Sequence, residues 1–297
     1  MRITAATVYR DSAAAIERAS EQLADYQRQV ASGKRVTRPS DDPDAAAAAI
    51  GERAEVAAVE QYTRTADSVT ARLMVMDTAL SDLVDRLSLA QATVVAAQGS
   101  TKAPVEREAA AQTLEGIKQA LVASLNSSFR GAHLFAGANS LEPPYVMTGT
   151  TVGPYQGATQ EVTVDLDPTR VATIGMNGSA IAQGSAARDL FATLDAAISA
   201  ARAGDSAALG AAGAELAAAF DRATAAQLRV GTSLASLDAL RTQLTDRRLA
   251  GNARIAKLED ADLAAAITGM NQADASYRAA LATTGRITQL SLMDYLT

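Results

Sequence analysis

Hydrophobic residues recur at steps of three and four along most of the chain, the spacing of one face of an α-helix. The first such segment runs from about Ala5 to Ser32, and Gly33 is expected to end it. Its apolar residues repeat at every seventh position: Tyr9, Ile16, Leu23 and Val30. A helix with one apolar stripe gains little stability alone, so this segment is predicted to pack against a partner.

A second unpartnered stripe lies at the other end of the chain, between Leu258 and Thr297. Asp274 interrupts it, and its apolar members are Leu263, Ile267, Met270, Tyr277, Leu281, Ile287 and Leu290. Because each terminal stripe needs a partner, we expect the two ends to pair as a coiled coil. The apolar residues of both stripes are therefore the predicted assembly interface.

The linker after the first helix reads SGKRVTRPSDDP. Its predicted motif residues are Gly33, Lys34, Arg35, Pro39, Asp41, Asp42 and Pro43. Asp42 is a suitable N-cap and Pro43 suits the first position of a second helix. That helix should run to about Gln98, with apolar residues in alternating steps of four and three: Val69, Leu73, Met76, Leu80, Leu83, Leu87, Ala90, Val94 and Ala97. The mean step is that of a coiled coil.

Pro104 is expected to open a third helix that ends near Gly131 and pairs antiparallel with the second. Between Gly137 and Gly184 the pattern changes to that of strands and turns. EVTVDL alternates polar and apolar residues, Asp167-Pro168 supplies a turn before VATIGM, and Asn177-Gly178 is a further hairpin signal. The helical pattern resumes at Leu190 and breaks once, at Gly204-Asp205.

The predicted fold class is mainly α: an elongated helical rod or coiled-coil bundle built from the N- and C-terminal segments, with a small antiparallel β insert in the middle. The predicted parts are an assembly helix with its linker (1–38), a first helical part (39–136), the β-rich insert (137–187), a second helical part (188–257) and a C-terminal assembly helix (258–297).

Composition supports a thin interior. Hydrophobic residues make up 48% of the 297 residues, yet much of that is alanine, only 4% are aromatic and Trp is absent. The net charge of −6 argues against nucleic acid as a partner. The longest apolar runs are too short for membrane insertion, and the N-terminus lacks the pattern of a cleaved signal peptide.

Candidate chemistry is sparse. His133 is the only histidine, and its neighbours Leu134 and Phe135 favour a packing role over catalysis. The acidic residues around Asp42 lack the spacing of a calcium loop. The sequence therefore predicts no catalytic residue, cofactor or metal site. The basic run Lys34, Arg35 and Arg38 fits equally a solvated loop or a contact with an acidic neighbouring subunit.

Five segments carry a resemblance to a known family: MRIT at the start, SGKRVTRPSDDPDAAAAAI in the linker, RGAHLFAG, GPYQG, and LSLMDYL near the end. Together they resemble the hook-filament junction proteins of the flagellin superfamily. The linker is the most specific piece, because flagellins usually have alanine-alanine-glycine after the paired aspartates, where Pro43 and Asp44 stand here.

The resemblance implies a structural adapter without enzymatic activity, located in the bacterial flagellum outside the cell. It implies export through the flagellar type III apparatus without a cleaved signal peptide. The implied partners are the proximal hook-associated junction protein, flagellin, like subunits in a ring and a type III export chaperone, and the terminal helices are expected to pair on assembly. Two alternatives are a flagellin filament subunit and a cytoplasmic helical signalling rod; the latter requires a hairpin without a β insert.

Overall fold

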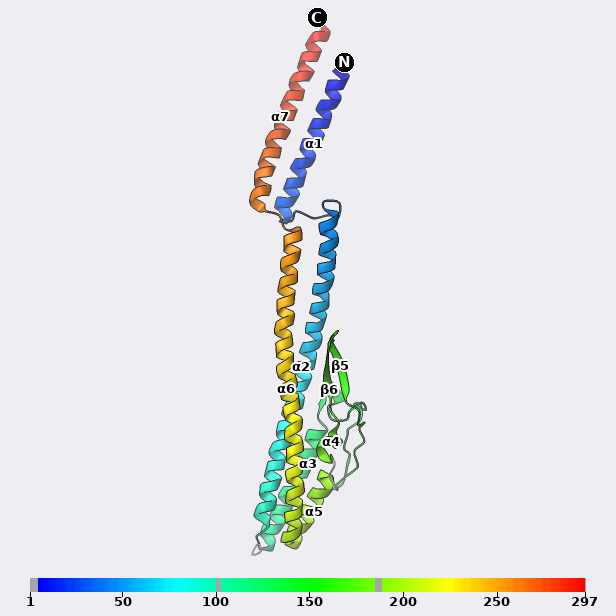
Figure 1. The fold of residues 1–297 in the computed structure, drawn as a ribbon, viewed down its shortest axis with the longest axis vertical. Helices are drawn as coiled ribbons and strands as arrows, with labels where there is room; N and C mark the ends of the chain where they lie inside the picture. Colours follow the sequence, from blue (N-terminus) through cyan, green and yellow to red (C-terminus); the bar gives the residue numbers. More distant parts are fainter. Residues whose placement is uncertain (1–4, 100–102, 185–188, 297) are drawn as a thin grey trace. The chain divides into compact units, whose positions relative to one another are not determined.

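A computed structural model describes residues 5–99, 103–184 and 189–296, with side chains described except those of residues 5, 6, 8 and 287–296. The long helices are α1 (Ala5–Ser32), α2 (Pro43–Ala97), α3 (Pro104–Leu125), α5 (Leu190–Ala203), α6 (Ser206–Glu259) and α7 (Leu263–Leu296). A short helix, α4 (Gly178–Ala182), and three strand pairs lie between α3 and α5. The prediction of a mainly helical fold with a small antiparallel strand insert is confirmed (Figure 1). No described helix is long and apolar enough to cross a membrane.

The chain divides into two compact units, which are considered separately. One unit combines residues 1–60 with 245–297, and the other comprises residues 61–244. Helices α2 and α6 contribute to both units.

In the unit of residues 61–244, the interior follows the apolar stripe of α2. Each of the nine predicted stripe residues from Val69 to Ala97 is buried, and several have no exposed surface. Leu237 and Leu244 of α6 are buried as well, and Arg241 of α6 forms an ion pair with Asp67 of α2 at 2.8 Å. The alternating step of four and three thus identified the buried face of α2 correctly.

Helix α3 runs back along the second half of α2, as predicted (Figure 1), and also packs closely on α5. Its end was predicted near Gly131, but the helix ends at Leu125. The reason is Asn126, whose side-chain amide donates to the Tyr145 carbonyl at 2.7 Å and accepts from the Tyr145 amide at 3.0 Å. An asparagine side chain that bonds to backbone outside the helix stops the helix. The strand region consequently begins at Ser128, earlier than the predicted boundary at residue 137.

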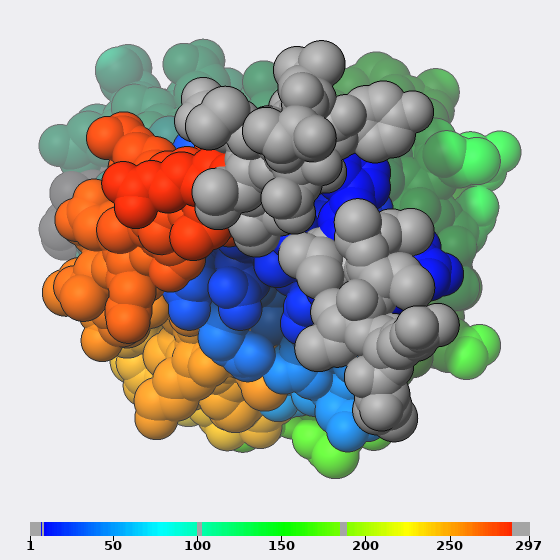
Figure 2. Space-filling view, turned by 90° about the horizontal axis from the view of Figure 1, so that it is seen from above, coloured from blue at the N-terminus to red at the C-terminus, as the bar shows by residue number. Residues whose placement is uncertain are grey.

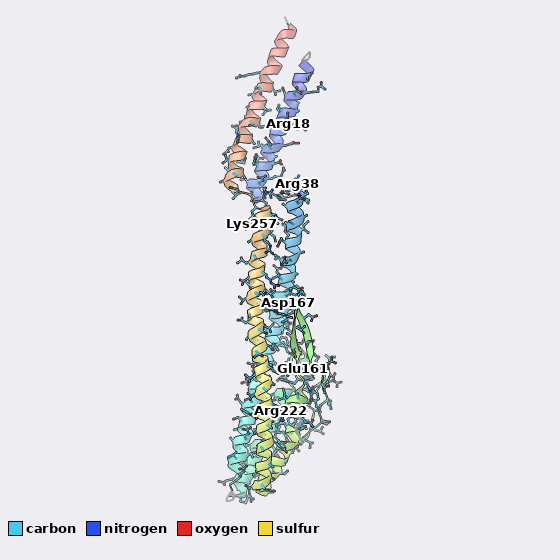
Figure 3. All side chains as sticks on the ribbon, in the orientation of Figure 1. Arg18, Arg38, Glu161, Asp167, Arg222 and Lys257 are labelled. Carbon is cyan, nitrogen blue, oxygen red and sulfur yellow. The ribbon has the colours of Figure 1, made fainter. Side chains whose placement is uncertain are left out.

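The strand region contains three antiparallel pairs. They are β1 (Ser128–Phe129) with β2 (Ala132–His133), β3 (Met147–Thr148) with β4 (Thr151–Val152), and β5 (Val162–Asp167) with β6 (Arg170–Gly175). The predicted hairpin around Asp167-Pro168 is confirmed: the Asp167 carboxylate accepts hydrogen bonds from the Thr169 amide and hydroxyl, both at 2.8 Å. Figure 3 shows Asp167 at the tip of this hairpin and Glu161 near its base.

The prediction of a hairpin at Asn177-Gly178 is wrong. Asn177 instead caps the N-terminus of α4, because its side-chain oxygen accepts from the Ser179 amide at 3.0 Å. Arg222 of α6, labelled in Figure 3, donates to the Ile181 carbonyl at 3.0 Å and holds α4 in place. Asparagine suits both tight turns and helix N-caps, so the dipeptide alone does not distinguish them.

In the other unit, α1 and α7 pack side by side and antiparallel (Figures 1 and 2). The start of α2 and the end of α6 belong to the same unit, and Arg254 of α6 pairs with Glu52 of α2 at 2.7 Å. The two ends of the chain are therefore partners within one molecule.

Candidate functional site

Small and half-buried residues form the seam between α1 and α7. On α7, Ala266 and Ala273 are buried, while Met270 and Tyr277 are half-buried. A Cβ atom on Gly269 would lie 2.6 Å from the Tyr26 ring of α1, so this ring packs directly over the glycine. The seam therefore brings the two helices close through small residues on α7, rather than through the larger aliphatic residues of the predicted stripe.

The predicted interface residues divide into two groups. Half-buried at the seam or beside it are Ile16, Leu23, Val30, Met270 and Tyr277. Still exposed in the paired helices are Tyr9 (60%), Leu263 (48%), Ile267 (45%) and Leu281 (45%). The side chains of Ile287 and Leu290 lie outside the described residues.

Helical geometry explains this division. At about 100° per residue, Leu263, Ile267 and Leu281 lie roughly 60–120° round α7 from Ala266 and Ala273. We call Leu263, Ile267 and Leu281 the α7 flank. Sequence reasoning missed the alanines because the chain is rich in alanine, and one apolar alanine position looks like another.

The linker docks on the connection between α6 and α7. Gly33 ends α1 with a left-handed φ of +69°, and its carbonyl accepts from the Ala261 amide at 2.9 Å. The Glu259 carbonyl accepts from the Arg35 and Val36 amides at 2.6 and 3.2 Å. We call residues 33–36 together with residues 258–261 the linker joint.

Glu259 is the central charged group of this joint. Its side chain is 5% exposed, and its carboxylate lies 3.0 Å from Lys34 Nζ and 2.5 Å from an Arg53 guanidinium nitrogen. Although an acidic residue near a helix end is often solvated, this carboxylate is buried between two cations. The basic run had two interpretations, a solvated loop or a contact with an acidic neighbouring subunit. Lys34 instead pairs with an acidic residue of its own chain.

The remaining linker motif residues organise the start of α2. Asp42 accepts from the Ala45 amide at 3.0 Å and pairs with Arg35 at 2.9 Å, so it caps the helix as predicted, with Pro43 as the first helical residue. One carboxylate oxygen of Asp41 accepts from the amides of Thr37 and Arg38 at 3.0 and 2.8 Å. Figure 3 labels Arg38 in this linker, and Pro39 follows it.

These hydrogen bonds make the linker sensitive to acid. The amides of Arg38 and Thr37 hold the pKa of Asp41 below its ordinary value, so the interaction is fully present above about pH 3.9 and is lost as the pH falls through the lowered pKa. We expect the Thr37 and Arg38 amide resonances to titrate together below about pH 4 in NMR spectra. Asp41→Asn should abolish this titration, and its persistence in that variant would contradict the assignment.

The two central resemblance motifs meet in the unit of residues 61–244. The Tyr155 hydroxyl of GPYQG donates to the Phe135 carbonyl of RGAHLFAG at 2.9 Å, and the Ala158 amide donates to the Ala136 carbonyl at 2.9 Å. The Gly178 amide also donates to the Phe135 carbonyl, at 2.8 Å. We call this network around residues 135–137 the glycine cluster, because Gly137, Gly157 and Gly178 line it. Its role is to join the strand region into one body.

His133 has a structural contact, with Nδ1 2.8 Å from the Asn126 carbonyl. Within the described parts of the chain, no group of three or more histidines and carboxylates is arranged to hold a metal ion. The described geometry offers contact surfaces and a linker that is held by hydrogen bonds.

Comparison with known proteins finds sequence similarity to flagellar proteins. Residues 4–140 match the bacterial flagellin N-terminal helical region. Flagellar hook-associated protein 3 of Salmonella typhimurium is 30% identical over 182 residues, which cover 61% of this chain and 56% of that protein. The match therefore spans little more than half of the Salmonella protein. The Escherichia coli protein of the same name is 28% identical over 306 aligned positions, covering 94% of this chain and 96% of the relative.

Solved structures share the fold. A putative flagellar hook-associated protein from Vibrio parahaemolyticus superposes with a TM-score of 0.69 at 16% identity, covering 74% of this chain and all of that one. FlgL from Bacillus cereus gives 0.61 at 20% identity, covering 69% and 99%. In sequence, residues 4–140 of the chain match the bacterial flagellin N-terminal helical region, and in fold the chain is similar to these solved structures.

Proposed function

We propose that this protein is a structural adapter of the bacterial flagellum at the hook-filament junction. The observation that carries the proposal is the similarity to the E. coli hook-associated protein 3 over 94% of this chain and 96% of the relative. A likeness along the whole length includes both terminal helices, the linker and the strand region. The proposed partners are the proximal hook-associated junction protein, flagellin, like subunits in a ring and a type III export chaperone.

The terminal helices supply the assembly surface in this proposal. Leu263, Ile267 and Leu281 stay half-exposed while α1 and α7 are paired. An apolar ribbon of this kind is stabilised by burial against another helix. We infer that helices of neighbouring subunits cover the α7 flank in the assembled junction, and that the linker joint sets the path by which the terminal helices leave α2 and α6.

Antibody labelling of isolated flagella tests this location. A junction adapter is labelled as one short band between hook and filament, and a strain lacking it carries hooks without filaments and sheds flagellin into the medium. Labelling along the filament, or normal filaments in the deletion strain, would refute the proposal.

One alternative is supported by the match to the flagellin N-terminal region: the chain is itself a filament subunit. The two functions differ in polymerisation. Purified flagellin extends seeds into long filaments, whereas an adapter adds to hook ends and stops. Electron microscopy of the purified protein incubated with hook fragments separates these cases.

A further inference from the structure

A groove beside α2 has no assigned role. It lies within the unit of residues 61–244, has a volume of about 620 Å³ and is bounded by α2, the β1–β2 hairpin and the β5–β6 hairpin. Its apolar lining includes Val69, Phe129, Val164 and Ile174, and none of the described residues that line it is a carboxylate.

Three arginines, Arg64, Arg72 and Arg130, line the same groove. Arg64 donates to the Gln61 side chain at 2.8 Å, Arg72 donates to the Ile174 carbonyl, and the Arg130 guanidinium lies 5.2 Å from the Phe129 ring centroid. None of these contacts is with a carboxylate. In a chain with a net charge of −6, three arginines around an apolar floor favour a ligand that carries both an apolar and an acidic side chain.

The chain itself displays such a pair. Leu141 is 84% exposed, more than any other large hydrophobic residue among those described, and Glu142 beside it is also exposed. The loop that carries them is fixed at both ends: the Ser140 carbonyl accepts from the His133 amide at 2.7 Å, and the Tyr145 amide donates to the Asn126 side chain at 3.0 Å. Leu141 and Glu142 are therefore presented on a rigid support.

The backbone directions keep this loop and the groove of one molecule apart. Successive amides of a strand point to opposite edges; the His133 amide bonds to Ser140, whereas the Leu134 amide bonds to Ser127, next to β1. The loop thus flanks one edge of β2, and Phe129 and Arg130 flank the other. A protein with a projecting loop on one side and a matching groove on the other can join identical copies head to tail.

We propose that Leu141 and Glu142 of one copy dock into the groove of a second copy, with Leu141 on the apolar floor and Glu142 among Arg64, Arg72 and Arg130. This proposal deepens the junction role and rests on it for its biological setting, because a ring of like subunits requires a heterologous contact. One loop in one groove is a small interface, so the contact should be weak between free molecules and gain strength when many copies are aligned.

Cross-linking of the purified protein tests the contact without reference to the flagellum. The chain has no cysteine, so Ser140→Cys beside Leu141 and Ser68→Cys in the groove supply its only thiols when introduced, and they leave Leu141, Glu142 and the three arginines in place. Mixing the two single variants with a short thiol cross-linker should give a covalent heterodimer whose yield rises with protein concentration. Ser88→Cys replaces Ser68→Cys in the control mixture, because Ser88 is an exposed serine of the same helix outside the groove. Arg86, which is also exposed on this helix and outside the groove, serves as the charge control. Equal yields in both mixtures would overturn the proposal.

Charge exchange then tests the pairing. Arg64→Glu or Glu142→Arg alone should reduce the heterodimer yield at least about tenfold, since each replaces an attraction by a repulsion, while Arg86→Glu should leave it unchanged. Combining a chain carrying Arg64→Glu with one carrying Glu142→Arg should restore the yield. Failure of this rescue, with thermal unfolding unchanged in all variants, would show that Glu142 does not enter the groove. If cross-linking succeeds but antibodies locate the protein elsewhere, only the junction role fails.

Discussion

Leu281→Asp should leave the free protein almost unchanged and abolish stable joining of filaments to hooks. Leu281 is 45% exposed on the α7 flank, so a carboxylate there stays hydrated in the monomer. Exposed substitutions usually change stability by no more than about 0.5 kcal/mol, and we expect the thermal unfolding midpoint to move by only about one or two degrees.

In the assembled junction, Leu281→Asp should be strongly destabilising. If a neighbouring helix covers the α7 flank, the new carboxylate loses its water without gaining a partner, at a cost of several kcal/mol per subunit. Summed over a ring of like subunits, this cost should exceed what the junction tolerates. Cells carrying Leu281→Asp are therefore expected to bear hooks without filaments and to release flagellin into the medium.

A matched control is Ala282→Asp, which adds the same charge to the same helix about 100° away. Secreted variant protein must be quantified in both strains, because reduced export would also leave hooks bare. Normal filaments with Leu281→Asp would show that the α7 flank is not an assembly surface. A large fall in the unfolding temperature of the monomer would show that Leu281 already contributes to a folded interior.

The helical part of the fold was predictable because its signals are local. Gly33, Pro43, Pro104 and Gly204-Asp205 mark helix ends through backbone constraints that act within a few residues. The α2 stripe was equally clear, since large aliphatic residues at a regular step leave little doubt about which face is buried. These features need no knowledge of distant segments.

The parts that were missed depend on partners far away in the sequence. Asn126 ends α3 through Tyr145, and Glu259 is a joint residue because Lys34 and Arg53 reach it across more than 200 positions. The seam of α7 uses Ala266 and Ala273, which carry no distinguishing pattern in an alanine-rich helix. The motifs at Phe135 and Tyr155 were recognised only through family resemblance, and their physical reason became visible in the glycine cluster.

Gly137→Ala should disrupt the strand region more severely than the addition of one methyl group would suggest. Gly137 has a left-handed φ of +57°, and a Cβ atom there would lie 2.1 Å from the Ala158 carbonyl oxygen and 2.7 Å from that of Gln160. Both obstacles are backbone atoms held by hydrogen bonds, such as that from the Ala138 amide to the Gln160 carbonyl at 3.0 Å. Relief therefore requires the glycine cluster to separate, because no flexible side chain can move aside.

We expect Gly137→Ala to lower the free energy of unfolding, measured by chemical denaturation, by at least about 3 kcal/mol, because left-handed strain and overpacking act together. Gly149→Ala is the matched control: its φ is +62°, and nothing lies within 4 Å of the added Cβ. It carries the strain without the collision, so its loss should be only about 1 kcal/mol. The difference between the two losses of unfolding free energy is the cost of placing a Cβ atom where the motif segments approach each other closely. Equal losses would mean that the cluster yields easily and that Gly137 matters only for its backbone conformation.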